Sequence, residues 1–500
     1  MSSLWLDSEL KNFEKLQQDI EVDVCIVGGG ILGITCGYYL SNAGLKVAVL
    51  ERDKIGSKTT GHTTGKITIA HDLFYKYLID TFGTNFAKGY LDANLEAISN
   101  IDEIVKKENI NCDFEIQNNY IFTNNTNDKQ KIQDEVISLE TLGFNAKYMT
   151  KIPAPISHVA AICYPNQAQF NSIKYIYSLC DKILSRSASI YENTIVYDIQ
   201  KDKNEYITYV KDYKVRSKYV ILASHYPIIN APGFYFLKMY QSTSYIIGVD
   251  TKQELFEGMY INIDSPTISL RTAKYNDSRI LLVGGSDHKT GSKIDLSNSY
   301  KDLENIVNSL YPNSKVLYKW EAEDCISLDK IPYIGEFSTL MPNFYVATGF
   351  KKWGMTSSNV ASKIITNKIL GKENKYEDIF LSTRFHPIKN YSEMGNILKE
   401  TSYSLVINKF KLPKDKINDI SNDEGKIISI NEQKIGVYKD KTGKIFAIKP
   451  ICSHLGCELS FNNLGKTWDC PCHGSRFKYT GESIADPSIK GLEVLDYNLE

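Results

Sequence analysis

Six residues close to the C-terminal end have the types and spacing that bind metal. They are Cys452, His454, Cys457, Cys470, Cys472 and His473. Thiolates and imidazoles bind zinc, and they also hold iron–sulfur clusters. The other cysteines lie singly in the first 330 residues, where we interpret most of them as small buried hydrophobic side chains. The sequence therefore predicts a metal centre near the C-terminus rather than a disulfide scaffold.

The two loops that carry these residues resemble the cluster-binding loops of Rieske proteins. They read CSHLGC and CPCHGS, and 15 residues separate His454 from Cys470. The resemblance implies a [2Fe–2S] cluster with one iron held by Cys452 and Cys470 and the other by His454 and His473. Replacing two thiolates with neutral imidazoles raises the reduction potential to about −150 to +300 mV. A zinc site made of two cysteines and two histidines is the alternative.

Further features of the loops follow from the same resemblance. The resemblance to respiratory Rieske proteins of the cytochrome bc type, in which the equivalent cysteines are bridged, implies a Cys457–Cys472 disulfide. Two free thiols are the alternative, because the cytosol is reducing. Ser475 lies where it can donate a hydrogen bond to a cluster sulfide. Phe477 stands where those proteins have a tyrosine, so one donor fewer implies a lower potential.

The surroundings of the cluster can be anticipated in the same way. Pro487 matches the proline loop that covers the cluster in Rieske proteins, although a plain turn would also explain it. We expect His454 and His473 to be exposed and to form the surface through which electrons leave.

A second pattern that indicates chemistry lies near the N-terminus. A buried strand at 22–27 runs into Gly28-x-Gly30-x-x-Gly33, which opens a helix, and the next strand ends at Glu51. In such a unit the glycines allow a tight turn, close approach of a pyrophosphate and close helix packing. The helix N-terminus attracts the phosphates, and the terminal acid can bind ribose hydroxyls. This context predicts a dinucleotide site.

Roughly residues 20–370 resemble the D-amino-acid oxidase and sarcosine/dimethylglycine dehydrogenase group of FAD-dependent oxidoreductases. The matching segments are GGGILG, Glu51-Arg52, Thr194-Ile195-Val196, the strand ending at Ala223-Ser224, Ile331-Pro332-Tyr333-Ile334-Gly335 and the Gly349/Gly354 pair. The resemblance implies FAD, with its adenine end near Glu51 and Arg52 and its flavin near residues 349–356. Val196, Gly349 and Gly354 are further candidates for contact with this cofactor.

One histidine in this region suggests a covalent flavin. The segment SKTTGHTTGK is similar to the dehydrogenase segment whose histidine is joined to FAD, and His62 falls at that position. Gly61 replaces the tryptophan that is usual there. The alternative is that His62 only forms a noncovalent hydrogen bond.

The substrate is less well defined than the cofactors. Relatives in this group oxidise amines, commonly amino acids, so a cation is needed for a carboxylate. Arg271 is a candidate, although a surface ion pair would explain it equally well. His225 and His288 could assist, but local hydrogen bonds explain them better. The catalytic residues are otherwise unknown at this stage.

Two redox centres in one chain predict an electron converter. A substrate would reduce FAD by hydride transfer, and the cluster would pass single electrons to an unknown redox partner. The alternative is a non-catalytic relay or redox sensor, or electron flow in the reverse direction, from the cluster towards the flavin.

A Rieske oxygenase would need two more histidines and a carboxylate close together. The remaining histidines are widely spaced, at His62, His71, His158, His225, His288 and His386. The combination of the two parts resembles a bacterial family of Rieske FAD-dependent oxidoreductases.

Composition limits the architecture and the partners. The net charge of −1 gives no general attraction to nucleic acid. We identify no membrane-spanning run and no secretory signal, so we expect a cytoplasmic protein.

We predict an α+β fold, namely a Rossmann-like α/β FAD-binding domain with a β-rich substrate subdomain, plus a small all-β Rieske domain. The expected boundaries are 1–20 for an N-terminal extension, 21–371 for the oxidoreductase domain, 372–404 for a linker and 405–500 for the Rieske domain.

Overall fold

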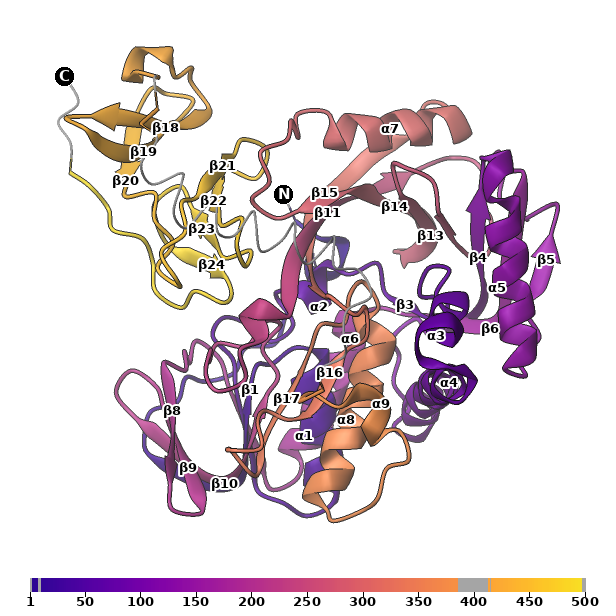
Figure 1. Ribbon diagram of the computed structural model, residues 1–500, viewed down its shortest axis with the longest axis horizontal. Helices are drawn as coiled ribbons and strands as arrows, with labels where there is room; N and C mark the ends of the chain where they lie inside the picture. The colour runs from indigo at the N-terminus through magenta and orange to yellow at the C-terminus, as the bar shows by residue number, and fades with distance from the viewer. Residues whose placement is uncertain (1, 8–9, 385–411, 414, 497–500) are drawn as a thin grey trace.

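The computed structural model describes residues 2–7, 10–384, 412–413 and 415–496. We call residues up to 384 the N-terminal part and residues from 412 the C-terminal domain. The N-terminal part contains two large sheets, and the C-terminal domain contains two small ones. Figure 1 shows the C-terminal domain, coloured orange and yellow, at one corner of the molecule beside β11 and β15.

The first large sheet forms the dinucleotide-binding half. Its central order is β16-β17-β10-β1-β2-β7, with β8 and β9 attached to β10. The strands are β1 (Ile20–Val27), β2 (Val47–Leu50), β7 (Ala188–Tyr191), β8 (Asp198–Asp202), β9 (Glu205–Tyr209), β10 (Lys214–Leu222), β16 (Tyr333–Glu336) and β17 (Phe344–Thr348). Strands β7, β2, β1, β10 and β17 run parallel, as expected for strands joined by helical crossovers. The predicted unit of strand, glycine turn, helix and strand is present.

Helices on this sheet bury most of their surface. Helix α1 (Ile31–Asn42) packs between α6 (Ser172–Leu184) and α8 (Gly354–Ile369), so it is apolar on nearly every face. Gly33 lies in the first turn of α1, where an added Cβ would lie 1.9 Å from the Gly28 carbonyl oxygen. This contact explains why the third glycine of the motif is needed for close packing.

The second large sheet forms the β-rich half. Its order is β15-β11-β14-β13-β12-β4-β6-β3, with β5 attached to β6. The strands are β3 (Lys66–Ile67), β4 (Glu115–Thr123), β5 (Lys147–Met149), β6 (Ala160–Gln169), β11 (Met239–Asp250), β12 (Met259–Asn262), β13 (Ile268–Tyr275), β14 (Ser278–Lys289) and β15 (Lys315–Ser327). Helix α7 (Ser299–Leu310) packs on β11 and β14, while α3 (Tyr75–Phe82), α4 (Thr84–Lys107) and α5 (Lys129–Thr141) lie at the other end (Figure 1).

The C-terminal domain is built only of short strands and loops, apart from one 3-10 turn. One antiparallel sheet contains β18 (Glu424–Ile430), β19 (Gln433–Lys439) and β20 (Ile445–Ile448). The other contains β21 (Ser460–Asn462), β22 (Thr467–Asp469), β23 (Arg476–Lys478) and β24 (Ser483–Ala485). The two cysteine–histidine loops flank β21 and β22, so the second sheet positions them.

The ends of the N-terminal part pack onto its core. Trp5 is buried, and its indole nitrogen donates to the Thr63 carbonyl. The first part of the expected linker forms α9 (Glu377–Phe380), and Arg384 is buried against Asp329. Residues 372–384 therefore belong to the N-terminal part by their packing, while residues 385–404 of the expected linker lie outside the described residues.

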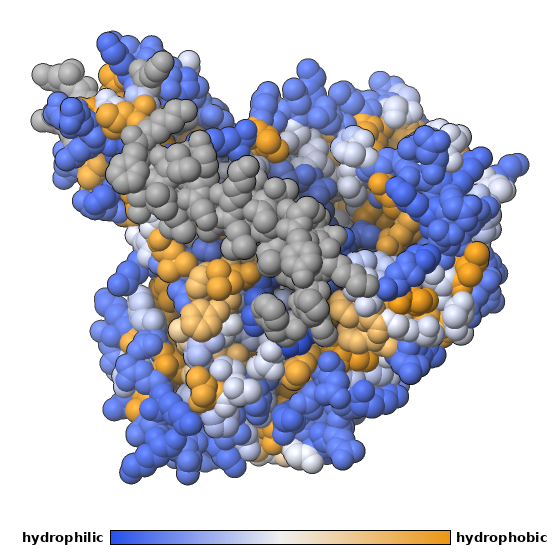
Figure 2. Space-filling model, viewed as in Figure 1, coloured by the Kyte–Doolittle hydropathy of each residue, from blue (hydrophilic) through white to orange (hydrophobic). Residues whose placement is uncertain are grey.

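Apolar residues can be followed on one face of the surface and along the helices. The face shown in Figure 2 is mostly hydrophilic, with apolar side chains gathered in a few places. Among the described helices none is both long and apolar enough to cross a membrane.

The packing of α1 generates a first prediction. Replacing Gly33 with alanine should lower the free energy of unfolding by about 2–3 kcal/mol, because the new Cβ meets a backbone carbonyl that cannot rotate away. Gly37→Ala in the same helix is the control. Its Cβ would meet the end of the Ile183 side chain at 3.2 Å and Val49 at an ordinary contact distance of 3.6 Å, and alanine favours helices by up to about 1 kcal/mol. Thermal unfolding of both variants checks this, and equal midpoints would contradict it.

Candidate functional site

A long pocket in the dinucleotide-binding half collects the residues expected to contact FAD. Gly28, Gly30, Glu51, Arg52, Val196 and Gly354 all line it. They come from the turn before α1, the end of β2, the segment after β7 and the start of α8, which the parallel sheet brings to one edge. Such an edge, at the carboxyl ends of parallel strands, is where open α/β sheets bind ligands.

Glu51 holds the turn as well as facing the pocket. Its carboxylate accepts hydrogen bonds from the backbone nitrogens of Gly29 at 2.8 Å and Asp53 at 2.8 Å. Burial raises the pKa of Glu51, and these two donors oppose that effect. Each carboxylate oxygen keeps a further lone pair for a ligand hydroxyl. Gly33 and Gly349 are not among the described residues that line the pocket, and both are packing positions.

His62, the residue expected to be joined to the flavin, is not among the described residues that line the FAD pocket. His62 ends the short helix α2 (Thr59–His62), and its Nδ1 lies 2.8 Å from the Lys58 carbonyl oxygen. Lys58, Thr59 and Thr60 line the FAD pocket, and His62 lines an adjoining groove towards the C-terminal domain, which Lys58 and Thr59 also line. Covalent attachment of the flavin through His62 stays a prediction.

A second cavity lies between the dinucleotide-binding half and the β-rich sheet. Its volume is about 120 Å³. The sheet contributes Ser244, Ile246, Ile261, Ser269, Gly284 and Asp324, and the loop before α8 contributes residues 350–353. Lys66 also lines it. The cavity adjoins the FAD pocket, because His225, Phe350 and Gly354 line both.

Arg271, the residue expected to bind a substrate carboxylate, lies elsewhere. Its guanidinium donates to the carbonyls of Gly65 at 2.9 Å and Thr272 at 3.1 Å and lies over the Trp5 ring. It is not among the described residues that line the cavity. The cavity instead contains Lys66 and Asp324, which the sequence patterns did not indicate. Burial raises the pKa of Asp324 to about 7.

The two histidines of the C-terminal loops fit an iron–sulfur cluster. Their rings lie 5.1 Å apart between centroids, and the Nδ1 atom of each is buried without a hydrogen-bond partner among the described residues. The side chains of Cys452 and Cys470 lie next to each other in the same place. Burial lowers the pKa of His454 to about 4 and that of His473 to about 3, so both rings are neutral at neutral pH. Neutral imidazoles with free nitrogen lone pairs are what the cluster requires.

A disulfide joins the two loops between Cys457 and Cys472, as the resemblance implied. The sulfur atom of Cys470 lies within 4.8 Å of both bridged sulfurs. This triplet is not a metal site, because the sulfurs of a disulfide carry no thiolate charge.

The segment 484–490 connects the two redox sites. On one side the Ser453 hydroxyl donates to the Lys490 carbonyl, and the backbone nitrogen of Ser488 donates to the Ser475 hydroxyl. On the other side Asp486 and Ile489 line the FAD pocket. The segment that contains Pro487 therefore lies between a cluster loop and the FAD pocket.

The histidine side of the cluster site faces the N-terminal part, which corrects the expectation of exposure for His473, whereas His454 is partly exposed. His473 is only 3% exposed, and the Phe236 ring meets it edge-on at 5.6 Å. The Nε2 atom of His454 lies 2.7 Å from Asn230 Oδ1. The sequence of a Rieske-like domain indicates which face carries the histidines, but docking onto another domain decides whether that face meets solvent.

Polar contacts hold this docking. Arg52 binds Asp486 at 2.9 Å, and Gln241 donates to the Asp486 carbonyl at 2.8 Å. Arg476, a buried residue of β23, contacts Glu321 and Glu323 of β15 at 2.6 Å each. It also contacts Asp469 of its own domain.

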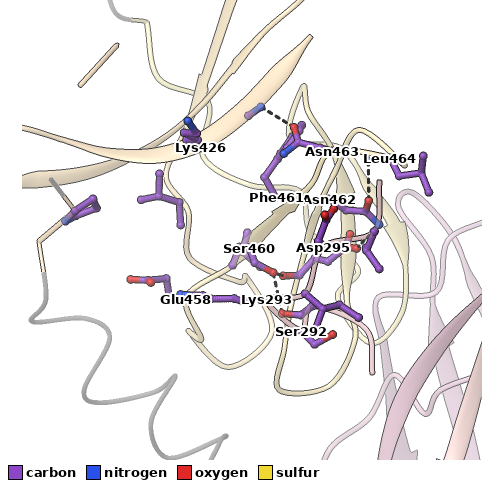
Figure 3. Close-up of a pocket in the computed structure, with 18 of the residues that line it drawn as sticks. Ser292, Lys293, Asp295, Lys426, Glu458, Ser460, Phe461, Asn462, Asn463 and Leu464 are labelled. Atoms are coloured by element: carbon purple, nitrogen blue, oxygen red, sulfur yellow. Dashed lines mark hydrogen bonds between the residues drawn. The ribbon is translucent and has the colours of Figure 1, made fainter. Parts of the chain in front are cut away.

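A large cleft lies apart from these sites. It measures about 1070 Å³ and separates residues 291–297 of the N-terminal part from residues 458–464 of the C-terminal domain. Figure 3 shows Ser292, Lys293 and Asp295 beside Ser460 and Asn462 in this cleft. None of the described residues expected to contact FAD or the cluster lines it, so we interpret it as a solvent-filled gap between domains.

Comparison with known proteins identifies both parts. The family model for FAD-dependent oxidoreductases (DAO) matches residues 23–368, and the model for the Rieske [2Fe-2S] domain matches residues 411–496. The chain belongs to the FAD-dependent oxidoreductase family and carries a Rieske domain. It is an FAD-dependent enzyme with a [2Fe–2S] cluster, and the expected fold class is confirmed.

Individual relatives agree with this assignment. The chain is 38% identical to the Rieske 2Fe-2S iron–sulfur protein YhfW of Bacillus subtilis (strain 168), over 98% of this chain and 96% of that protein. It is 23% identical to gamma-glutamylputrescine oxidoreductase of Escherichia coli (strain K12), over 75% and 89% respectively. Glycine oxidase from Geobacillus kaustophilus has a similar fold, with a TM-score of 0.62, 17% identity, and coverage of 73% of this chain and 100% of that one.

The buried arginine of the interface generates a second prediction. Arg476→Met should lower the free energy of unfolding by roughly 3–5 kcal/mol, because it leaves three largely buried carboxylates without their cation. Lys478→Met on the same strand is the control. Lys478 pairs only with exposed Glu482, so its loss should cost less than about 1 kcal/mol. Chemical denaturation checks both, and similar losses would contradict the role of Arg476.

Proposed function

We propose that this enzyme oxidises a small amine or amino acid at FAD and passes the electrons singly to its own Rieske cluster. The observation that carries the proposal is the docking of the cluster loops. Two residues of the Rieske domain, Asp486 and Ile489, line the FAD pocket, and both histidines face the N-terminal part. A Rieske domain that exchanged electrons only with an external partner would not need to place its histidines against the FAD-binding part of the chain.

In this proposal the family cofactors sit where the sequence patterns indicate. The glycine turn at Gly28 and Gly30 receives the pyrophosphate at the start of α1, and Glu51 binds ribose hydroxyls. Cys452, His454, Cys470 and His473 ligate the cluster. FAD, when bound, takes two electrons as a hydride, and the cluster takes one electron at a time.

The chain's own residues have separate tasks. The cavity beside Ile246 and Ile261 holds the substrate against the pocket and excludes water, since these two apolar side chains are buried. His225 lines both spaces, and its Nε2 is buried without a partner among the described residues, so it can accept a hydrogen bond there. The kind of relative found, which includes gamma-glutamylputrescine oxidoreductase, supports an amine as the reducing substrate.

The direct test is anaerobic titration of the holoprotein with a panel of amines and amino acids, followed by visible absorption and EPR. We expect one class of compound to bleach the flavin first, and the reduced Rieske signal to follow. Electron flow from flavin to cluster is contradicted if the flavin bleaches and the cluster stays oxidised. If no amine bleaches the flavin but the two centres exchange electrons, the protein is a relay.

A glycine at the interface offers a sharper test of internal transfer. Gly291 approaches the second cluster loop so closely that an added Cβ would lie 2.5 Å from the Pro471 nitrogen. Gly291→Ala should therefore push the cluster away and slow its reduction about tenfold or more, while flavin bleaching keeps its rate. Stopped-flow absorption with the amine identified in the titration measures both phases.

The control for this variant is Gly143→Ala. Gly143 has φ +81° and Gly291 has φ +78°, so both substitutions strain the backbone alike, but nothing lies within 4 Å of the Cβ at 143. The control should leave both phases unchanged. Equal cluster reduction in the two variants would mean that electrons do not cross this interface.

A further inference from the structure

One carboxylate in the cavity beside the FAD pocket has no partner in the described part of the chain. Asp324 lines this cavity, and no described group forms a hydrogen bond or an ion pair with its carboxylate. Alternate residues of a strand share a face. Ala322 accordingly lines the cavity too, whereas Glu321 and Glu323 bind Arg476 on the opposite face. Asp324 therefore faces the cavity and not the interface between the domains.

The contacts around Asp324 place it at the end of the cavity that adjoins the FAD pocket. The thiol of Cys325 donates to the His225 carbonyl at 3.3 Å, and Ile326 forms a β-bridge with Phe350. Both His225 and Phe350 line the cavity and the FAD pocket. Because Asp324 is one or two residues from each of these contacts, a group that it binds lies close to the FAD pocket.

The two lysines at this end of the cavity are paired with other acids. Lys352 binds Asp287 at 3.0 Å, and Lys351 binds Asp72. Burial raises the pKa of Asp324 to about 7, and the nearby charge of Lys352 opposes this effect only in part. The charges of each lysine and its acid largely cancel, so the ionised Asp324 leaves this end of the cavity negative.

Lys66, the remaining lysine that lines the cavity, belongs to its other end. Its Nζ donates to the Tyr260 carbonyl at 2.8 Å and to Ser269 Oγ at 2.7 Å. Ser269 is on β13 and Asp324 is on β15, three strands apart in the sheet, which corresponds to about 14 Å. A carboxylate held away from water and from any cation is costly, and a cationic ligand would offset that cost.

We propose that Asp324 binds the nitrogen of the substrate as an ammonium group, at the end of the cavity next to the FAD pocket. This rests on the proposed oxidation of an amine in the same cavity, and it narrows the substrate to amines that enter in the protonated form. The carboxylate accepts N–H groups of the ammonium. The Nε2 atom of His225, buried without a partner among the described residues, is a further acceptor at this end.

The test measures binding to the oxidised holoprotein without turnover, at about pH 8, where Asp324 is charged. The probe is tert-butylamine, which is an ammonium ion at this pH, and tert-butanol is its neutral counterpart of the same shape. The carbon next to the nitrogen of tert-butylamine carries no hydrogen, so the probe cannot be oxidised to an imine. The change in flavin absorption reports occupancy.

We expect the ammonium ion to bind at least about tenfold more tightly than the alcohol. Equal binding of the two probes, or binding of neither, overturns the proposal. Since no electron is transferred, the result is independent of whether an amine reduces the flavin or the cluster receives electrons.

Variants assign the effect to one residue. Asp324→Asn keeps the shape of the side chain and removes its charge, so it should weaken binding of the ammonium ion about 30-fold and leave tert-butanol binding unchanged. Glu323→Gln is the control, because Glu323 is the adjacent carboxylate on the same strand but faces Arg476. It should change binding of the ammonium ion less than about threefold. Equal loss in both variants, or none in Asp324→Asn, overturns the subsite.

The unmodified protein provides a further measurement if Asp324→Asn does not bind FAD. A protonated carboxyl group carries no charge, whereas an alkylamine stays protonated up to about pH 10. The affinity for the ammonium ion should therefore be full above about pH 7 and fall up to tenfold per pH unit below it. A constant affinity from about pH 6 to pH 9 overturns the proposal.

Other charged groups near Asp324 bear on this profile. Those that act on it or line the same cavity are Lys352, Asp287, Glu323, His225, Lys351 and Lys66. Lys66 is the one to separate, because burial lowers its pKa to about 7 and its charge would repel a cation in the same pH range. In Lys66→Met the fall in affinity below about pH 7 should persist, and its disappearance would assign the profile to Lys66 and overturn the proposal.

Discussion

The close contact between the cluster loops and the N-terminal part is the constraint on which both redox sites depend. Gly291 and Gly474 lack side chains where the two surfaces meet, so backbone and the Gln241 side chain approach without a gap. Because the Rieske domain supplies Asp486 and Ile489 to the wall of the FAD pocket, the pocket is complete only in the docked arrangement. The two cofactor sites are therefore structurally linked.

Electrostatics give this contact its specificity. Arg476 and Arg52 each bridge the interface to carboxylates, and their side chains are 5% and 18% exposed. Exposed ion pairs on this protein, such as Lys76 with Asp80, contribute little because water competes for both partners. A buried arginine between two glutamates penalises any shifted docking, since each charge would lose its partner. The interface thus favours one relative position of the two domains.

The substrate cavity illustrates how separated segments build one site. Lys66 follows the first βαβ unit, Ser269 lies on β13, and residues 350–353 precede α8. The nine-stranded sheet brings the first two together, and the loop after β17 closes the space against the FAD pocket.

Local sequence patterns were sufficient for the cofactors and the main elements. The glycine motif requires a tight turn and a helix beside it. The strand Ile445–Ile448 and the turns of the C-terminal loops are likewise determined by residues that are close together in the sequence. Cys452, His454, Cys470 and His473 could be recognised because their ligand types and spacing are local too. Tertiary structure alone decided that His62 lies outside the lining of the FAD pocket, that Arg271 binds backbone carbonyls and that His473 is covered. Those outcomes depend on contacts between residues that lie up to several hundred positions apart in the sequence, such as Arg52 and Asp486. The spacing of residues within a local motif carries no information about the geometry of such contacts.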